Sequence, residues 1–166
     1  DEMSRITSSG GVLIGSTTTG SITIAGVTAA VSQGLAGKVT LHAGAGESQV
    51  KFENAGSTFN SLVVQADNGV VISGVDVTTD YGVMLLNGDS DSATNGQATS
   101  KNKVEITGDV TLTAELDLTL QAESGNIQRT GKLTLSSKAN VIINSDLGSV
   151  ASGNMNLYIE ADTDAS

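Results

Sequence analysis

The sequence predicts an all-β fold, a right-handed parallel β-helix (β-solenoid) of about six coils, with 21–24 residues and three short strands in each coil. Three observations favour this fold. Only four aromatic residues occur in 166 and Val is abundant, so the core must be aliphatic, which favours strands. Apolar residues recur in pairs at i and i+2, the alternation of a half-buried strand. These pairs repeat in three columns with a near-constant period, which is typical of stacked repeats.

The three columns are named A, B and C, in the order in which a coil uses them. Column A begins at Val39, Leu62, Val83, Leu118 and Val141, with second apolar residues at Leu41, Val64, Leu85, Leu120 and Ile143. Column B begins at Val50, Val71, Val104, Ile127 and Val150. Column C begins at Val75, Val110, Leu133 and Leu157, with second apolar residues at Val77, Leu112, Leu135 and Ile159. The first three starts in column C each precede a start in column A by eight residues, so each strand is expected to pair in parallel with its equivalent one coil later.

Two segments depart from the repeat. Residues 1–38 are expected to form an irregular first coil, in which Val12/Ile14 and Ile22/Ile24 serve as the A and B strands. Residues 87–103 are predicted to be an inserted polar loop, because the steps of all three columns lengthen there and the composition turns to Asp, Ser, Asn and Gly. The whole chain, residues 1–166, is therefore expected to be a single β-helix domain.

An antiparallel β-sandwich is the main alternative fold, because it also uses short strands with frequent turns. A sandwich does not require the same three-strand spacing to recur coil after coil, so the β-helix is favoured. A helix over residues 109–123 is disfavoured, because the apolar residues there alternate with period two among several Thr residues.

The charge balance limits the classes of partner. The chain has 18 acidic and 8 basic side chains, a net charge of −10, whereas nucleic-acid binding needs clustered Lys and Arg. An anionic membrane surface is disfavoured for the same reason, and no apolar run approaches the roughly 20 residues of a membrane helix. The chain begins at Asp1 without a signal peptide, so we expect a processed chain or a piece of a longer one.

The stretch from Leu118 to Asp146, LTLQAESGNIQRTGKLTLSSKANVIINSD, resembles the repeats of filamentous-haemagglutinin-type and autotransporter-type adhesins. The likeness extends over roughly residues 38–162. These adhesins are large surface proteins built as right-handed parallel β-helices, so the resemblance implies the same fold and an extracellular or cell-surface location. The sequence departs from the family in having no Asn-Pro-Asn-Gly secretion motif and no Pro at all.

The search for catalytic residues identifies none, so we expect no enzyme activity. His42, the only histidine, alternates with core residues and is expected to point outward, away from any Ser-His-Asp arrangement. Five residues after the starts in column A stand Asp67, Glu123 and Asp146, with Asp89 one place late. We interpret this acidic row as solvated corner carboxylates. A calcium-binding row and a glycosidase-type site are the alternatives.

The insertion offers a second calcium candidate. Asn87, Asp89, Asp91 and Asn95-Gly96 place oxygen atoms at alternate positions before a glycine, loosely like the start of an EF-hand loop. No Glu closes the site at the twelfth position, so a polar loop is the preferred interpretation and no metal site or cofactor is assigned. The loop is also a place where a glycan or a partner could meet the rod.

These observations predict a structural or adhesive extracellular protein, a β-helical stalk or filament subunit. Open strand edges at its end would stack on another copy, or on further coils of a longer parent chain. A carbohydrate-binding or carbohydrate-active β-helix, with calcium as its metal, is the alternative. The expected partners are the chain itself and a glycan or surface protein, with no nucleic acid and no membrane insertion.

Overall fold

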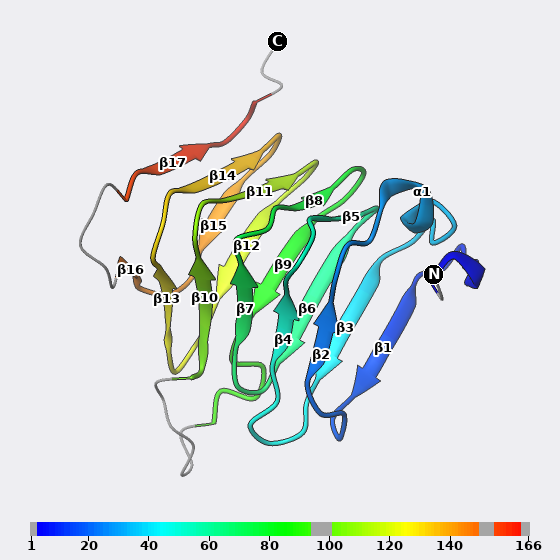
Figure 1. The fold of residues 1–166 in the computed structure, drawn as a ribbon, viewed down its shortest axis with the longest axis horizontal. Helices are drawn as coiled ribbons and strands as arrows, with labels where there is room; N and C mark the ends of the chain where they lie inside the picture. Colours follow the sequence, from blue (N-terminus) through cyan, green and yellow to red (C-terminus); the bar gives the residue numbers. More distant parts are fainter. Residues whose placement is uncertain (1–2, 94–100, 150–154, 164–166) are drawn as a thin grey trace.

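The computed structural model describes residues 3–93, 101–149 and 155–163. The chain forms a parallel β-solenoid of about six coils, in which every strand pair is parallel (Figure 1). Strands of the same column pair between successive coils and build three sheets, which we name sheets A, B and C after the columns. The fold predicted from the sequence is therefore confirmed.

Sheet A has the strand order β1-β3-β6-β9-β12-β15. Its strands are β1 (Val12–Ser16), β3 (Val39–Ala43), β6 (Leu62–Ala66), β9 (Met84–Asn87), β12 (Leu118–Gln121) and β15 (Val141–Ile143). Sheet B has the order β2-β4-β7-β10-β13-β16. Its strands are β2 (Ile22–Ile24), β4 (Val50–Phe52), β7 (Val70–Ser73), β10 (Lys103–Thr107), β13 (Asn126–Arg129) and β16 (Leu147–Ser149).

Sheet C has five strands in the order β5-β8-β11-β14-β17. They are β5 (Ser57–Phe59), β8 (Val77–Thr79), β11 (Val110–Ala114), β14 (Leu133–Ser137) and β17 (Leu157–Glu160). Along the central strands, buried and half-buried residues alternate, because successive side chains point to opposite faces of a sheet. The buried aliphatic side chains of the three sheets meet in one continuous core.

The register of sheet A confirms four of the five predicted starts and corrects one. Leu62 pairs with Met84 and Met84 with Leu118, so Met84 and Leu86 are the buried residues of β9. The prediction that Val83 and Leu85 point inward is wrong by one residue. The run from Val83 to Leu86 is apolar throughout, so both registers satisfy the alternation. The turn before β9 is one residue longer than predicted, because the step from Val75 in column C to Met84 in column A is nine residues and not eight.

Sheet B contains two further corrections. Val70, which pairs with Val50 and Val104, is the inward residue where the sequence suggested Val71. Ile127 pairs with Leu147, so the last strand of sheet B begins at Leu147. The predicted start, Val150, lies outside the described residues. The corner between β15 and β16 is short, so the strand of sheet B begins earlier in the sequence of this coil than predicted.

Sheet C follows the prediction, since Val77 pairs with Leu112 and since Val110, Leu133 and Leu157 are in register. The strand β8 itself begins at Val77, two residues after the predicted start at Val75. The sequence analysis missed the first strand of this sheet, β5, because its inward positions are Ser57 and Phe59, which give no repeated aliphatic signal. Ser57 is buried and its hydroxyl accepts a hydrogen bond from Val27 N at 3.2 Å.

The first coil is irregular, as predicted. Its A and B strands are confirmed, because Val12 pairs with Val39 and Ile22 pairs with Val50. On its third side a short helix, α1 (Ala29–Ser32), lies over β5 where a strand of sheet C would lie, and a 3₁₀ turn, η1 (Met3–Arg5), contacts α1. The first end of the solenoid is thus partly covered (Figure 1).

The insertion lies between β9 and β10, at the corner from sheet A to sheet B. Its predicted limits are close, but Asn87 and Lys103 themselves belong to the two strands. Residues 94–100 are not among the described residues. The first part of the insertion packs against the solenoid, because Gly88 and Asp89 are buried.

Candidate functional site

The corner between sheets A and B gathers half of the buried polar residues of the described chain. Ser48, Asn68 and Asn102 occupy equivalent positions, two residues before the paired inward residues Val50, Val70 and Val104 of sheet B, and are at most 5% exposed. The Asn102 side-chain amide donates hydrogen bonds to Ser124 Oγ at 2.9 Å and to Ala93 O at 3.2 Å. Asn102 therefore ties the inserted segment to the next coil.

The acidic row is in register throughout. Because β9 begins at Met84, Asp89 stands five residues after its strand start, as Asp67, Glu123 and Asp146 do, and is not one place late. The row is divided by burial: Asp67 is 4% and Asp89 0% exposed, whereas Glu123 and Asp146 are exposed. Solvated carboxylates are thus confirmed for the exposed pair and wrong for the buried pair.

The two buried carboxylates accept hydrogen bonds from the backbone of neighbouring coils. Asp67 Oδ2 accepts from Glu47 N at 2.7 Å, at a residue whose φ of 64° is left-handed. Asp89 Oδ2 accepts from Ser124 N, and Asp89 Oδ1 accepts from the Asn102 amide at 3.4 Å. A carboxylate that accepts backbone N–H groups makes charge-assisted hydrogen bonds. These acids therefore fix the corners of adjacent coils relative to one another.

The oxygens of the predicted calcium ligands have local partners. Asn87 Oδ1 accepts from Asp89 N at 2.9 Å, and Asp91 Oδ1 accepts from Ala93 N at 3.0 Å. The candidates Asn95 and Gly96 lie outside the described residues. Within the described part of the chain, no three His, Asp or Glu side chains are grouped so that they could hold a metal ion. Calcium binding stays a prediction.

A shallow hollow of about 210 Å³ lies on sheet A beside this corner, lined by Gln121, Glu123 and Asn144. Glu123 also accepts a hydrogen bond from the hydroxyl of Ser92 in the insertion. His42 lies on the same outer face, on β3, half-buried and pointing outward as predicted. The hollow is therefore a polar surface feature lined by side chains of two coils, and one of these side chains, Glu123, is hydrogen-bonded to the insertion.

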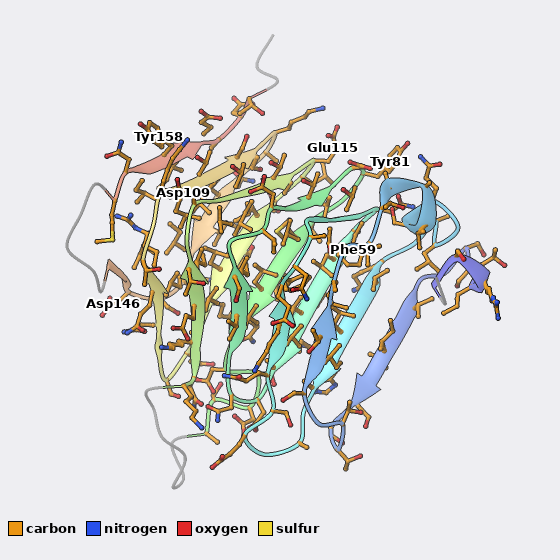
Figure 2. All side chains as sticks on the ribbon, viewed as in Figure 1. Phe59, Tyr81, Asp109, Glu115, Asp146 and Tyr158 are labelled. Atoms are coloured by element: carbon orange, nitrogen blue, oxygen red, sulfur yellow. The ribbon has the colours of Figure 1, made fainter. Side chains whose placement is uncertain are left out.

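The far end of the solenoid is open in the described part of the chain, where no helix or strand covers the last strands of the three sheets. Leu157 and Ile159 of β17 are 37% and 50% exposed, although their paired residues one coil earlier, Leu133 and Leu135, are fully buried. The strands β15, β16 and β17 are the last in their sheets. Figure 2 shows Tyr158 and Asp146 on the left side of the view, at the end opposite β1. The apolar core therefore reaches the surface here.

Arg129 is a feature of this end that the sequence analysis did not identify. It pairs with Ile106, which is fully buried, so its register position is an inward one. The guanidinium donates hydrogen bonds to Met155 O at 2.8 Å and to Gly131 O at 3.2 Å. The sequence did contain a signal for this role, because Arg129 stands at the position that Ile106 occupies one coil earlier. Arg129 ends the aliphatic row on the sheet B side.

The fold and the repeat register define the class of the protein as a parallel β-solenoid. No family model, curated protein or solved structure matches the chain. Among the described residues, no helix has the length and apolar character needed to cross a membrane.

Proposed function

We propose that this protein is a structural and adhesive rod of the extracellular space or cell surface, and that its open end stacks on another β-solenoid coil. The resemblance of residues 118–146 to filamentous-haemagglutinin-type and autotransporter-type adhesin repeats supports the location and the adhesive role. A stack of coils joined by parallel backbone hydrogen bonds supports the mechanical role. No catalytic activity belongs to this proposal.

The exposure of Leu157 and Ile159 is the observation that carries the proposal. Both residues hold inward register positions, so their exposed surface is the unfinished end of the core and not an outer face. Burial of such apolar surface drives association. Within the described residues, the three last strands also carry no further strand on their outer edges, which all face along the solenoid axis, so another coil of the same cross-section can pair with the three edges simultaneously.

The two ends of the solenoid differ, which defines the geometry of stacking. At the first end β1 and β2 are edge strands, while α1 and η1 cover the third side. In a stack of copies, β15 and β16 of one copy meet β1 and β2 of the next, and β17 meets the α1 side. Such a head-to-tail contact does not close on itself and yields a filament.

Light scattering and negative-stain electron microscopy over a range of concentrations test the stacking. We expect wild-type rods to associate end to end with an axial repeat of about 29 Å for six coils. Ile159→Asp places a charge at the open end and is expected to keep the protein monomeric. Tyr158→Ser, on the outer face of the same strand, is the matched control and should still associate. Single rods at every concentration, or stacking by Ile159→Asp, would contradict the proposal.

A further inference from the structure

The outer face of sheet A differs from the rest of this acidic protein in carrying no charged side chain on its strands. Its outward positions, as the alternating burial and the strand register define them, are Leu13, Gly15, Thr40, His42, Val63, Gln65, Leu85, Asn87, Thr119, Gln121 and Ile142, with Asn144 following the last strand. Sheet B, by contrast, presents Lys51, Lys103 and Glu105 outward. A ligand of sheet A therefore meets a neutral surface.

Four side-chain amides follow one another across this face. Gln65 pairs with Asn87 and Asn87 with Gln121, and Asn144 continues the row next to Gln121. We name these four residues the amide row. Successive strands lie about 4.8 Å apart, so the row extends over about 14 Å. This length suits an extended chain of several sugar units that runs along the solenoid.

The amide row has unused hydrogen-bonding capacity. Within the described residues, the side-chain amides of Gln65, Gln121 and Asn144 form no hydrogen bond, and Asn87 uses only its oxygen, which accepts from Asp89 N. Each amide offers a donor and an acceptor side by side, which matches a sugar hydroxyl that both donates and accepts. The hollow lined by Gln121, Glu123 and Asn144 is a recess in this row.

Apolar side chains accompany three of the four amides, two residues earlier in the chain: Val63 before Gln65, Leu85 before Asn87 and Ile142 before Asn144, whereas Thr119 precedes Gln121. The three apolar residues are half-buried. Aliphatic side chains can pack against the C–H faces of sugar rings, while the amide row contacts the ring hydroxyls. Binding sites combine apolar surface with a few placed polar groups in this way.

We propose that the outer face of sheet A binds a neutral polysaccharide along the amide row. Acidic glycans are disfavoured, because the corner beside the row carries Glu123 and Asp146 and the protein has a net charge of −10. The inference deepens the adhesive part of the proposed function by giving it a ligand class. It does not depend on stacking, since the amide row lies on a side face and not on the open end.

Affinity electrophoresis in native gels tests the inference with soluble polysaccharides as probes. The full chain is run in gels that contain hydroxyethyl cellulose, xyloglucan, galactomannan or, as a polyanionic comparison, polygalacturonate. We expect at least one neutral polysaccharide to retard the protein and polygalacturonate not to do so. Gln121→Ala combined with Asn144→Ala should raise the Kd about tenfold, as expected for two lost hydrogen bonds.

The matched control is Thr111→Ala combined with Thr134→Ala, which truncates two paired outward residues of sheet C. This control should bind as the wild type does, and circular dichroism melting shows that both double variants fold. Absence of retardation by every neutral probe, or equal weakening by the two double variants, would overturn the inference. The stacking variant Ile159→Asp should retain binding, so failure of the polysaccharide site and failure of the stacking are seen separately.

Discussion

The substitution of Met84 by Ala is the sharpest test of the register of β9. Met84 is fully buried between Leu62 and Leu118 of the neighbouring coils, so truncation leaves a cavity that the packed sheet cannot close. We expect a loss of about 2–5 kcal/mol in the free energy of unfolding. Leu85→Ala, one residue later on the outer face, should cost only about 1 kcal/mol, because Leu85 is half-buried.

Urea unfolding followed by circular dichroism measures both losses. With a slope of about 2 kcal/mol per M, Met84→Ala should lower the unfolding midpoint by at least about 1 M, and Leu85→Ala by about 0.5 M. Variants of adjacent residues share the same backbone and loop, so they control for each other. An equal loss in the two variants, or a larger loss for Leu85→Ala, would refute the register and restore Val83 and Leu85 as the inward pair.

Three further outcomes follow from the corner between sheets A and B. Asp89→Ala should lower the free energy of unfolding by about 1–3 kcal/mol in thermal or urea melts, because it leaves a buried backbone N–H group without its acceptor. The control Asp91→Ala, at an exposed site, should lower the free energy of unfolding by less than about 0.5 kcal/mol. Gly125→Ala should yield little folded protein in expression trials, since its Cβ would lie 1.4 Å from Asn102 O; Gly148→Ala, with no atom within 4 Å of a Cβ, should fold and express normally. Millimolar calcium should leave the melting temperature unchanged, because the candidate oxygens already accept N–H groups; a rise in the melting temperature would indicate a metal bound to the folded state.

Much of the fold follows from the sequence because the core rows repeat. Val39, Leu62, Leu118 and Val141 each begin a strand, and these four positions identify the parallel stacking without knowledge of any contact. The first coil was also predicted in outline from Val12 and Ile22. Repetition made these assignments possible, since a single coil offers too little periodicity to separate a solenoid strand from a sandwich strand.

The register errors occur where the apolar pattern is ambiguous. Val70, Val71 and Ile72 are consecutive apolar residues, as are Val83 through Leu86, so alternation alone permits either face to point inward. Pairing with the neighbouring coils decides, and that information is not local. The helix α1 and the strand β5 were missed for the opposite reason, because Ala29–Ser32 and Ser57–Phe59 contain too few large apolar residues to form a pattern.

The polar corner could be predicted only in part. The positions of Asp67, Asp89, Glu123 and Asp146 in one row were evident, but their burial was not, because burial depends on the backbone N–H groups that the acids meet. The amide row was hidden by the same error that displaced β9. With Val83 as the strand start, Asn87 falls out of line with Gln65 and Gln121, and the continuity across coils is lost.

Because the two ends of the solenoid differ, its coils are also expected to open in a definite order. Each coil contacts only its neighbours, so stability is a sum of coil-to-coil terms and opening propagates from an end. Among the described residues, the strands β15, β16 and β17 pair with a neighbouring coil on one side only, whereas in the first coil α1 contacts both η1 and β5. Amide protons should therefore exchange fastest in the last coil and progressively more slowly toward β6 and β7, so the proposed stacking surface is also expected to be the first part of the protein to fray.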